Sequence, residues 1–442
     1  MSFSERLRRS AFWINDRFNG GRVAYHYKDL NSTLDSPGRK SLDLQQSMVL
    51  KTLLHHAVNT TRYYSGYKNF RSTDDFPVIN KSIIRENFSD FLSSGYNAPE
   101  LHKVTTSGST GTPFTVYQDK IKRARHQADN IYYSEIAGYK IGTRLYYLRV
   151  WNELNRKSPI RRLMQNIIMV DAGNLSDESF ESLISRIRSD NSTKSLLAFS
   201  STYEALSHYL AKNPDHGSLN ISSIVTMSES LPDGAKQRLR EAFKCPVVSR
   251  YSNMENGFLA QQCIDENNEY HLNEASYYFE LLHPDKDEPV EAGIPGRIIV
   301  TDLFNYAMPM IRYDTGDMAI LEERSLCGRP GRVFSRVEGR RVDFIYDTRG
   351  NLLSPHVITN TMWKYSSEVR QFQFIQNGKG LYLIKLNCNE SSFPRAEELV
   401  SELRNYLGKN AVINMDFVDE IPLLASGKRK KIICNYNPDN PV

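Results

Sequence analysis

Strand-like and helix-like segments alternate between residues 160 and 302, and this alternation limits the folds open to the chain. Short apolar runs rich in β-branched residues are typical of buried strands, and apolar residues at helical spacing separate them. A strand, a helix and a second strand join through a right-handed crossover, which places the two strands parallel. The sequence therefore predicts an α/β fold with mainly parallel sheets. The predicted strands are 195–199, 221–227 and 246–251, and the predicted helices are 178–189, 202–211 and 232–243.

The pattern changes after Gly339, where short strands surround one amphipathic helix. About 100 residues with an apolar core of their own are enough for a small α+β domain. We therefore expect a large N-terminal α/β domain over residues 1–338 and a small, mobile α+β lid over residues 339–442. Strands are predicted at 371–375, 381–386 and 411–417, a helix at 394–407, and further helices between residues 40 and 90.

Composition excludes several classes of protein. The chain has 442 residues, of which 40% are hydrophobic, so it can form a sizeable core and is not a disordered tail. No apolar run approaches the roughly 20 residues that span a bilayer. The net charge of +5 is spread along the chain, which suits anionic small molecules and does not indicate a nucleic-acid partner. The opening residues lack a secretory signal, and five cysteines form no disulfide framework, so we expect a cytoplasmic protein of unknown oligomeric state.

Residues 4–18 form a candidate amphipathic helix. Leu7, Ala11, Ile14 and Phe18 fall near one face, and Arg6, Arg8, Arg9 and Arg17 lie elsewhere on it. Basic amphipathic helices bind membrane surfaces, so peripheral membrane contact is one interpretation. We favour the other, a helix that packs on its own domain.

A loop rich in Ser, Thr and Gly is the first candidate site. Small residues allow backbone N–H groups to converge, and the hydroxyls add donors, so such a loop can hold phosphate oxygens. It lacks the Lys of the Walker pattern, and Val116 indicates that a strand follows it. A flexible linker is the alternative. The loop residues are Thr106, Ser107, Gly108, Ser109, Thr110 and Gly111.

Three further segments carry candidate functional groups. Tyr251 and Glu255 follow the strand predicted at 246–251, and ligands bind at such strand ends. Tyr251 could stack on a base and Glu255 could bind Mg²⁺, although by itself the segment favours a helix start capped by Asn253. Asp314 and Asp317 flank a Gly turn, where a carboxylate could accept ribose hydroxyls, or the turn is merely solvated. Lys428 lies in a Gly-containing turn among other cations, a pattern typical of a solvated face.

These four segments, in this order, resemble the motif series of the adenylate-forming superfamily. Within it the chain is most similar to the phenylacetate–CoA ligase family, in its branch from capsular polysaccharide biosynthesis. The resemblance covers residues 40–435. It also rests on the run from Asp75 to Arg85, on Ser228-Glu229, on Arg312-Tyr313 before Thr315-Gly316-Asp317, and on Glu338-Gly339-Arg340.

The resemblance implies a role for each matching residue. ATP phosphates would be held by the loop Thr106–Gly111, and the nucleotide would also meet Ser228 and Glu229. Tyr251 would contact adenine, Glu255 would bind Mg²⁺, and Asp317 would hold the ribose with help from Arg340. Lys428 would reach the reacting carboxylate and α-phosphate from the lid, where a positioned cation offsets the charge that builds at phosphorus.

The resemblance also implies an activity. The chain would be an AMP-forming ligase that activates a carboxylic acid as acyl-AMP, releases pyrophosphate, and passes the acyl group to CoA. An amine or sugar acceptor in surface-polysaccharide assembly is the alternative, and a degenerate nucleotide-binding scaffold is the non-enzymatic one. Tyr146, Tyr147, Trp151 and Tyr203 are candidates for the acid pocket by position alone.

The chain departs from the family pattern at two places. Val342 stands where the hinge normally has an Asp, so the second half-reaction and its acceptor are open. Relatives often bind structural zinc through Cys and His, and here Cys263, His271 and Cys327 occupy such places. Because Ser325 replaces a fourth ligand, we expect buried cysteines and a satisfied His rather than zinc.

Overall fold

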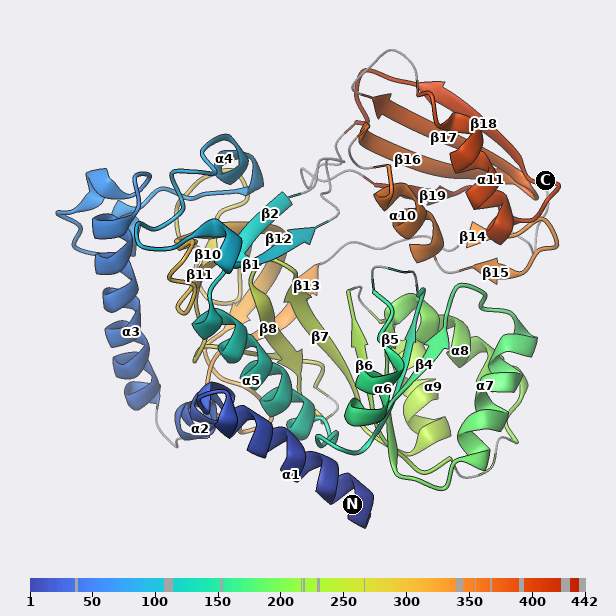
Figure 1. Cartoon of the computed structure of the whole chain (residues 1–442), viewed down its shortest axis with the longest axis horizontal. Helices are drawn as coiled ribbons and strands as arrows, with labels where there is room; N and C mark the ends of the chain where they lie inside the picture. Colours follow the sequence, from blue (N-terminus) through green and yellow to red (C-terminus); the bar gives the residue numbers. More distant parts are fainter. Residues whose placement is uncertain are drawn as a thin grey trace. The chain divides into compact units, whose positions relative to one another are not determined.

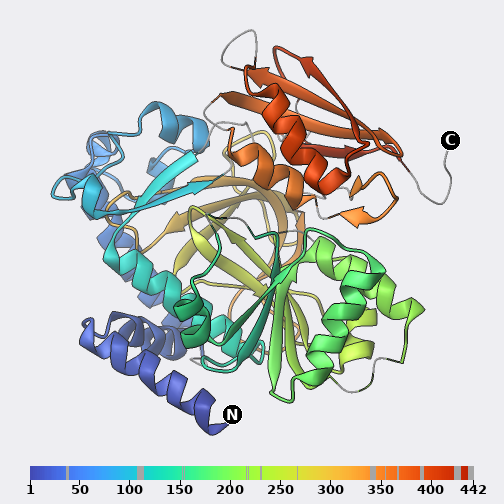
Figure 2. The same cartoon turned by 45° about the vertical axis from the view of Figure 1, so that its right-hand side comes forward.

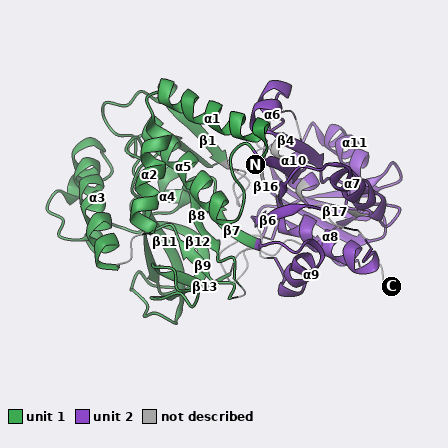
Figure 3. Cartoon of the chain, turned by 90° about the horizontal axis from the view of Figure 1, so that it is seen from below, with its two compact units in different colours: residues 1–106, 114–142, 248–339 green, residues 107–113, 143–247, 340–442 purple. Residues whose placement is uncertain are grey.

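The computed structural model describes most of the chain, which divides into two compact units (Figure 3). Unit 1 comprises residues 1–106, 114–142 and 248–339, and unit 2 comprises residues 107–113, 143–247 and 340–442. The predicted division into residues 1–338 and 339–442 stays a prediction. The described residues are 1–35, 39–106, 114–151, 153, 155–215, 217, 219–228, 231–265, 267–338, 345–353, 355–365, 368–388, 393–422 and 430–436.

The first part of unit 2 is the α/β layer that the alternating pattern predicts. Its strands run in the order β6-β5-β3-β4 and are all parallel. Helices connect them because parallel neighbours need a long crossover. The strands are β3 (Arg144–Arg149), β4 (Ile167–Asp171), β5 (Lys194–Phe199) and β6 (Ile221–Met227), and the helices are α6 (Pro159–Gln165), α7 (Asp177–Ser189), α8 (Ser200–Lys212) and α9 (Asp233–Phe243).

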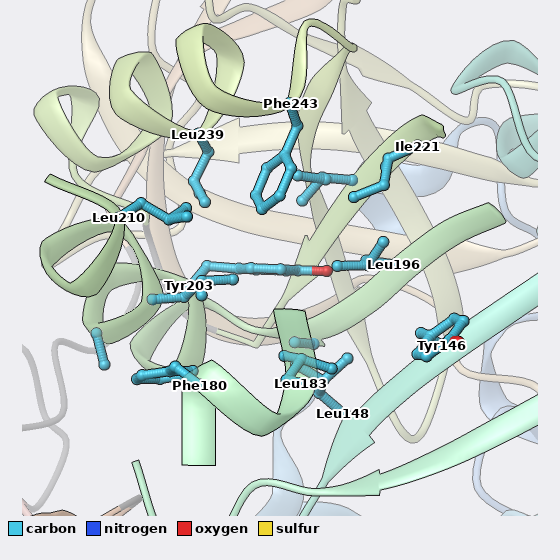
Figure 4. Close-up of a cluster of buried hydrophobic side chains, with 14 of the residues drawn as sticks. Tyr146, Leu148, Phe180, Leu183, Leu196, Tyr203, Leu210, Ile221, Leu239 and Phe243 are labelled. Carbon is cyan, nitrogen blue, oxygen red and sulfur yellow. The ribbon is translucent and has the colours of Figure 1, made fainter. Parts of the chain in front are cut away.

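The core of this layer explains two tyrosines that the sequence left as pocket candidates. Tyr146 and Tyr203 are buried among Leu196, Leu206 and Leu239, between the strands and the helices (Figure 4). The hydroxyl of Tyr146 reaches the edge of the core and donates to Asp190 Oδ2 at 3.0 Å. Both tyrosines therefore serve packing in this layer.

The sheet of unit 1 has a different character. Its strands run in the order β10-β11-β12-β13-β9-β8-β7, and every pairing among them is antiparallel. The α/β class is confirmed, but the expectation of mainly parallel sheets holds for β3–β6 and not for the strands of unit 1. No described helix lies between these strands, whereas parallel neighbours need a long crossover that usually contains one. The strands are β7 (Val247–Asn253), β8 (Gly257–Gln262), β9 (Tyr270–Leu272), β10 (Tyr277–Leu282), β11 (Pro295–Asp302), β12 (Tyr313–Glu322) and β13 (Val333–Glu338).

Helices and one hairpin complete unit 1 (Figure 1). The predicted helical character of residues 40–90 is confirmed as far as Thr60, where α3 ends. Beyond it, Ser72 starts only a 3-10 turn and Pro77 prevents a longer helix. The elements are α1 (Phe3–Phe18), α2 (Arg22–Leu34), α3 (Arg39–Thr60), α4 (Lys81–Glu86), α5 (Lys120–Ile136), and the paired strands β1 (His102–Thr106) and β2 (Phe114–Gln118).

The C-terminal part of unit 2 is a small α+β structure. Its sheet has the order β18-β17-β16-β19, and helices α10 and α11 cover one face (Figure 2). These strands and α11 confirm the elements that the sequence predicts after residue 370. No described helix has the length and apolar character needed to cross a membrane. The elements are β14 (Ile345–Tyr346), β15 (Leu352–Leu353), α10 (His356–Trp363), β16 (Val369–Gly378), β17 (Leu381–Cys388), α11 (Ala396–Leu407), β18 (Val412–Phe417) and β19 (Ile432–Cys434).

Candidate active site

The turn between β7 and β8 carries Glu255 into the interior of unit 1. Asn253 closes the turn, because its Oδ1 accepts a hydrogen bond from the backbone N–H of Asn256 at 2.8 Å. Gly257 has φ of +104°, which a residue with a side chain rarely adopts. The resulting hairpin leaves Glu255 buried rather than on the surface.

Two donors meet the buried carboxylate at one oxygen. Oε1 of Glu255 accepts a hydrogen bond from the Tyr313 hydroxyl at 2.6 Å and lies 2.9 Å from Lys81 Nζ. Burial by itself raises the pKa of Glu255, but the Lys81 ammonium and the Tyr313 hydroxyl outweigh it, so the pKa lies below its usual value. Glu255 is therefore ionised at neutral pH.

Lys81 reaches Glu255 because the segment before α4 pairs with the start of β12. Ile79 donates its N–H to the carbonyl of Arg312 at 3.0 Å and accepts from Asp314 N–H at 2.8 Å. Asn80 then caps α4 through its Oδ1, so the helix begins at Lys81. No short motif assigns a role to Lys81, because its partner lies 174 positions away along the chain.

Arg312 fixes this pairing from a strained backbone conformation. Its φ is +52°, a region that side chains rarely adopt. Its guanidinium donates to the Phe76 carbonyl at 3.0 Å and to Glu280 Oε1 at 3.1 Å. These contacts hold residues 76–81 against β12 and so help to place Lys81.

A second pair lies further along the same strand. The Tyr251 hydroxyl donates to Asp317 Oδ2 at 3.1 Å and is 3.3 Å from Thr315 Oγ1. Burial, with the neighbouring Asp317 carboxylate, raises the pKa of Tyr251 well above its usual value, so the phenol stays protonated and can donate. Gly316, with φ of +71°, turns the backbone between Thr315 and Asp317. The structure thus brings Tyr251 and Asp317 together, and Tyr313 links β12 to Glu255.

The other predicted nucleotide-binding residues are seen only in part. Thr106 ends β1, and β2 begins at Phe114, which confirms the strand expected around Val116. Ser228 follows β6 in unit 2, is exposed and has φ of +73°. The remaining candidates, Ser107, Gly108, Ser109, Thr110, Gly111, Glu229, Arg340 and Lys428, lie outside the described residues.

The three candidate zinc ligands also lie together. The sulfur atoms of Cys263 and Cys327 are 3.4 Å apart, and His271 Nε2 is 2.9 Å from Cys327 Sγ. All three ligand atoms fall within 4.8 Å of one another. Burial and the charge of Arg329 lower the pKa of His271 to about 4, so the imidazole is neutral and can bind a metal.

The loop around Cys327 is held in place by further polar contacts. Ser325 Oγ is 3.1 Å from Cys327 Sγ and donates to Glu269 Oε2 at 2.7 Å. The same oxygen of Glu269, which is buried, also accepts the backbone N–H of Leu326 at 2.9 Å. Two sulfurs and one imidazole nitrogen are a donor set that suits zinc, with Ser325 or water as a fourth ligand.

Unit 2 contains a cavity of about 640 Å³ between the loop after β3 and helices α10 and α11. Its aromatic lining is Trp151 and Tyr406, and Trp151 donates to the Val170 carbonyl at 2.9 Å. Its charged lining is predominantly acidic: the carboxylates of Glu153, Glu398 and Glu402 against the ammonium of Lys364. Of the four aromatic candidates for an acid pocket, Trp151 is the one that lines this cavity.

Comparisons with known proteins agree with the resemblance seen in the sequence. Residues 345–435 match the family described as the CapK C-terminal domain. Protein CapK of Staphylococcus aureus is 23% identical over 378 residues, which cover 82% of this chain and 80% of CapK. Phenylacetate-coenzyme A ligase of Thermus thermophilus is 28% identical over 123 residues, 28% of this chain and 27% of that ligase. The chain resembles the adenylate-forming enzymes.

Solved structures show the same fold for nearly the whole chain. A crystal structure of 2-hydroxyisobutyryl-CoA ligase, in complex with 2-HIB-AMP and CoA, matches with a TM-score of 0.60 at 18% identity. The match covers 92% of each chain. The predicted resemblance to the phenylacetate–CoA ligases, in the branch that contains CapK, is therefore confirmed.

Proposed function

We propose that the chain is an AMP-forming ligase that activates a carboxylic acid with ATP. A carboxylate oxygen of the acid attacks the α-phosphorus, the bond to pyrophosphate breaks, and an acyl-AMP forms. The observation that carries the proposal is the pair of Tyr251 and Asp317 beside the ionised, buried Glu255. These three residues occupy the motif positions that in the family contact adenine, ribose and the metal ion.

The carboxylate of Asp317 would accept hydrogen bonds from ribose hydroxyls, assisted by Arg340, and the ring of Tyr251 would meet adenine. Thr106 to Gly111 would hold the phosphates, and Ser228 and Glu229 would border the nucleotide. Lys428 would stabilise the charge at the α-phosphorus in the transition state. These roles rest on the motif resemblance, because most of these residues lie outside the described ones.

Mg²⁺ fits Glu255 with one constraint. A carboxylate that is ionised at neutral pH is a suitable oxygen ligand, and the metal would help pyrophosphate to leave. However, both contacts of Glu255 described above fall on Oε1, and one of them is the cationic Lys81. The ion would therefore be bound through Oε2, or would take the place of the Lys81 ammonium. In the second case Lys81 becomes available to a phosphate group.

CoA is the acceptor that the ligase relatives favour, and it is our first candidate. One observation favours an amine instead. In the cavity of unit 2, Lys364 pairs with Glu402 and Arg395 pairs with Glu398. The remaining charge on the lining is the carboxylate of Glu153, which would attract a protonated amine. An amino sugar in surface-polysaccharide assembly is an acceptor of this kind. Its amine would attack the acyl carbon after losing a proton, and AMP would leave.

Pyrophosphate release separates these proposals. The purified protein, with ATP and Mg²⁺, would be screened against aryl, fatty and sugar acids, and product formation would be followed with CoA or with amines. Pyrophosphate release that depends on one acid supports the ligase. Absence of release with every acid, in a protein that binds ATP, favours the scaffold alternative. An activity of this type uses cytoplasmic ATP, which agrees with the predicted location.

A structural zinc ion at Cys263, His271 and Cys327 is a separate proposal. The sequence favoured buried cysteines and a satisfied His, because only three ligands were found. The short distances among the three donor atoms support the metal instead, because zinc brings cysteine sulfurs and histidine nitrogens together around itself. The zinc content of the purified protein tests it.

A further inference from the structure

Helix α1 has two apolar faces, and only one of them is used within unit 1. Phe12 and Trp13 turn inward, where they pack with Tyr27 in the cluster formed by helices α2 and α5. Phe3, Leu7, Ile14 and Phe18 form a second stripe on the opposite side, and they are 83%, 60%, 55% and 87% exposed. We call these four residues the α1 stripe. Helix α1 therefore packs on its own domain, as the sequence favoured, but through Phe12 and Trp13 and not through the face with Leu7, Ile14 and Phe18.

The acidic residues of α1 are withdrawn from that surface. Glu5 is buried, and its Oε2 accepts the backbone N–H of Ser2 at 2.6 Å. Asp16 is also buried, and its two oxygens accept the N–H groups of Val23 and Ala24 at 3.1 and 2.9 Å, which caps the start of α2. Both carboxylates thus have structural roles on the inner side.

The arginines are divided differently. Arg9 is held inward by Glu135 of α5 at 2.5 Å. Arg6 and Arg17 are exposed, and on a helix of 3.6 residues per turn they flank one side of the α1 stripe. Arg8 is half-buried on the other side. The outer surface of α1 therefore combines a stripe of large apolar side chains with cationic edges and no carboxylate from α1 itself.

We propose that the α1 stripe docks on an anionic lipid bilayer, with α1 lying in the plane of the interface. Helices with this combination of large apolar side chains and flanking arginines bind at the headgroup boundary, where the side chains enter the acyl region and the arginines meet lipid phosphates. The stripe extends along about 24 Å of helix, so one face of unit 1 can rest on the bilayer. The proposal is independent of the proposed function.

A second copy of the chain is a poorer occupant for the same surface. A two-fold contact places the same patch on both partners, so Arg6 and Arg17 of one copy would face the arginines of the other. The carboxylates that could offset this charge, Glu5 and Asp16, are buried and already bonded. A lipid surface supplies the missing negative charge without any such conflict.

Vesicle sedimentation of the full chain tests the proposal. Phosphatidylcholine vesicles, with and without phosphatidylserine, would be compared at low and high salt. We expect binding to the anionic vesicles that weakens with salt. The variant L7E/I14E should lower the partition coefficient more than tenfold, and R6Q/R17Q should lower it about 25-fold, at about fivefold per arginine.

Matched variants keep the result interpretable. Ile294 lies in unit 1 with 52% exposure, close to that of Ile14, so Ile294→Glu should leave binding unchanged. If L7E/I14E unfolds, the milder F3S/F18S changes two side chains that are more than four-fifths exposed. The proposal is overturned if anionic vesicles are not bound, or if F3S/F18S binds like the unmodified chain. It is also overturned if the stripe variants abolish a dimer in light scattering instead.

Discussion

The ion pair between Lys81 and Glu255 gives the sharpest test of the site, through the variant Lys81→Met. At 2.9 Å the attraction is about 6 kcal/mol for an effective dielectric constant of about 20. The net loss of stability is smaller than this for two reasons. Lys81 is 28% exposed, so solvent screens the attraction, and the substitution also removes the free-energy cost of partly desolvating its ammonium. We expect the free energy of unfolding to fall by about 2–3 kcal/mol, as for other buried carboxylates that lose a partner.

The dependence on pH has a defined sign. In the unmodified chain the pKa of Glu255 lies below its usual 4.5, so its stabilisation is present above pH 4.5 and is lost as the pH falls through the folded value. Without Lys81, burial remains the largest influence and raises the pKa of Glu255. The buried, ionised carboxylate then lowers the free energy of unfolding at pH 7, and this loss disappears when acidification protonates the carboxylate. The unfolding free energies of the two proteins should therefore converge between pH 7 and about pH 4.

Urea unfolding followed by circular dichroism measures both effects. A double-mutant cycle of Lys81→Met, Glu255→Gln and the combined variant isolates the pair. Lys120→Met, which removes an exposed lysine, is the control and should change stability by less than about 0.5 kcal/mol. A coupling energy below about 0.5 kcal/mol, or a difference in stability that does not change with pH, would refute the reasoning.

Three further predictions concern the other groups. Tyr251→Phe keeps the ring but removes the hydrogen-bond donor to Asp317. In a pyrophosphate assay the KM for ATP should rise about tenfold with kcat nearly unchanged. A fall in kcat alone would contradict this role. Lys428→Ala should slow adenylate formation by a factor of about 10²–10³, while the ATP affinity measured by calorimetry stays nearly unchanged. Pyrophosphate exchange at the rate of the unmodified chain would exclude the role of Lys428. Cys263→Ser should abolish zinc binding in elemental analysis and lower the melting temperature, whereas Cys388→Ser should change neither. An equal zinc content in both variants would contradict the proposed metal site.

The sequence predicted several elements of unit 2 because each of these leaves a local signal. The strand at 221–227 is confirmed at both ends, and α7 begins one residue before its predicted start. The sequence of a short strand does not indicate whether its neighbour runs parallel or antiparallel to it. The antiparallel pairing of β7 to β13 was missed for that reason.

The candidate site was predictable in its motifs and not in its contacts. Tyr251, Glu255 and Asp317 could be named because each lies in a recognisable short pattern. The position of Lys81 depends on the pairing of Ile79 with β12, a contact between distant segments that no local pattern encodes. The sequence also left the partner of the Leu7, Ile14 and Phe18 face open, because hydrophobic periodicity marks an apolar face without saying what covers it.

The pairing of distant segments in unit 1 has a consequence for how the chain is made. One core cluster joins side chains between Leu54 and Phe91 to Met308, Met310 and Ile311. On a ribosome that adds about 5–20 residues per second, the later group emerges roughly 10–50 s after the earlier one. Tyr64 and Phe76 therefore lack part of their final cover during this interval. A slower or colder synthesis lengthens that exposure, so the nascent chain is a natural client for chaperones that bind apolar segments.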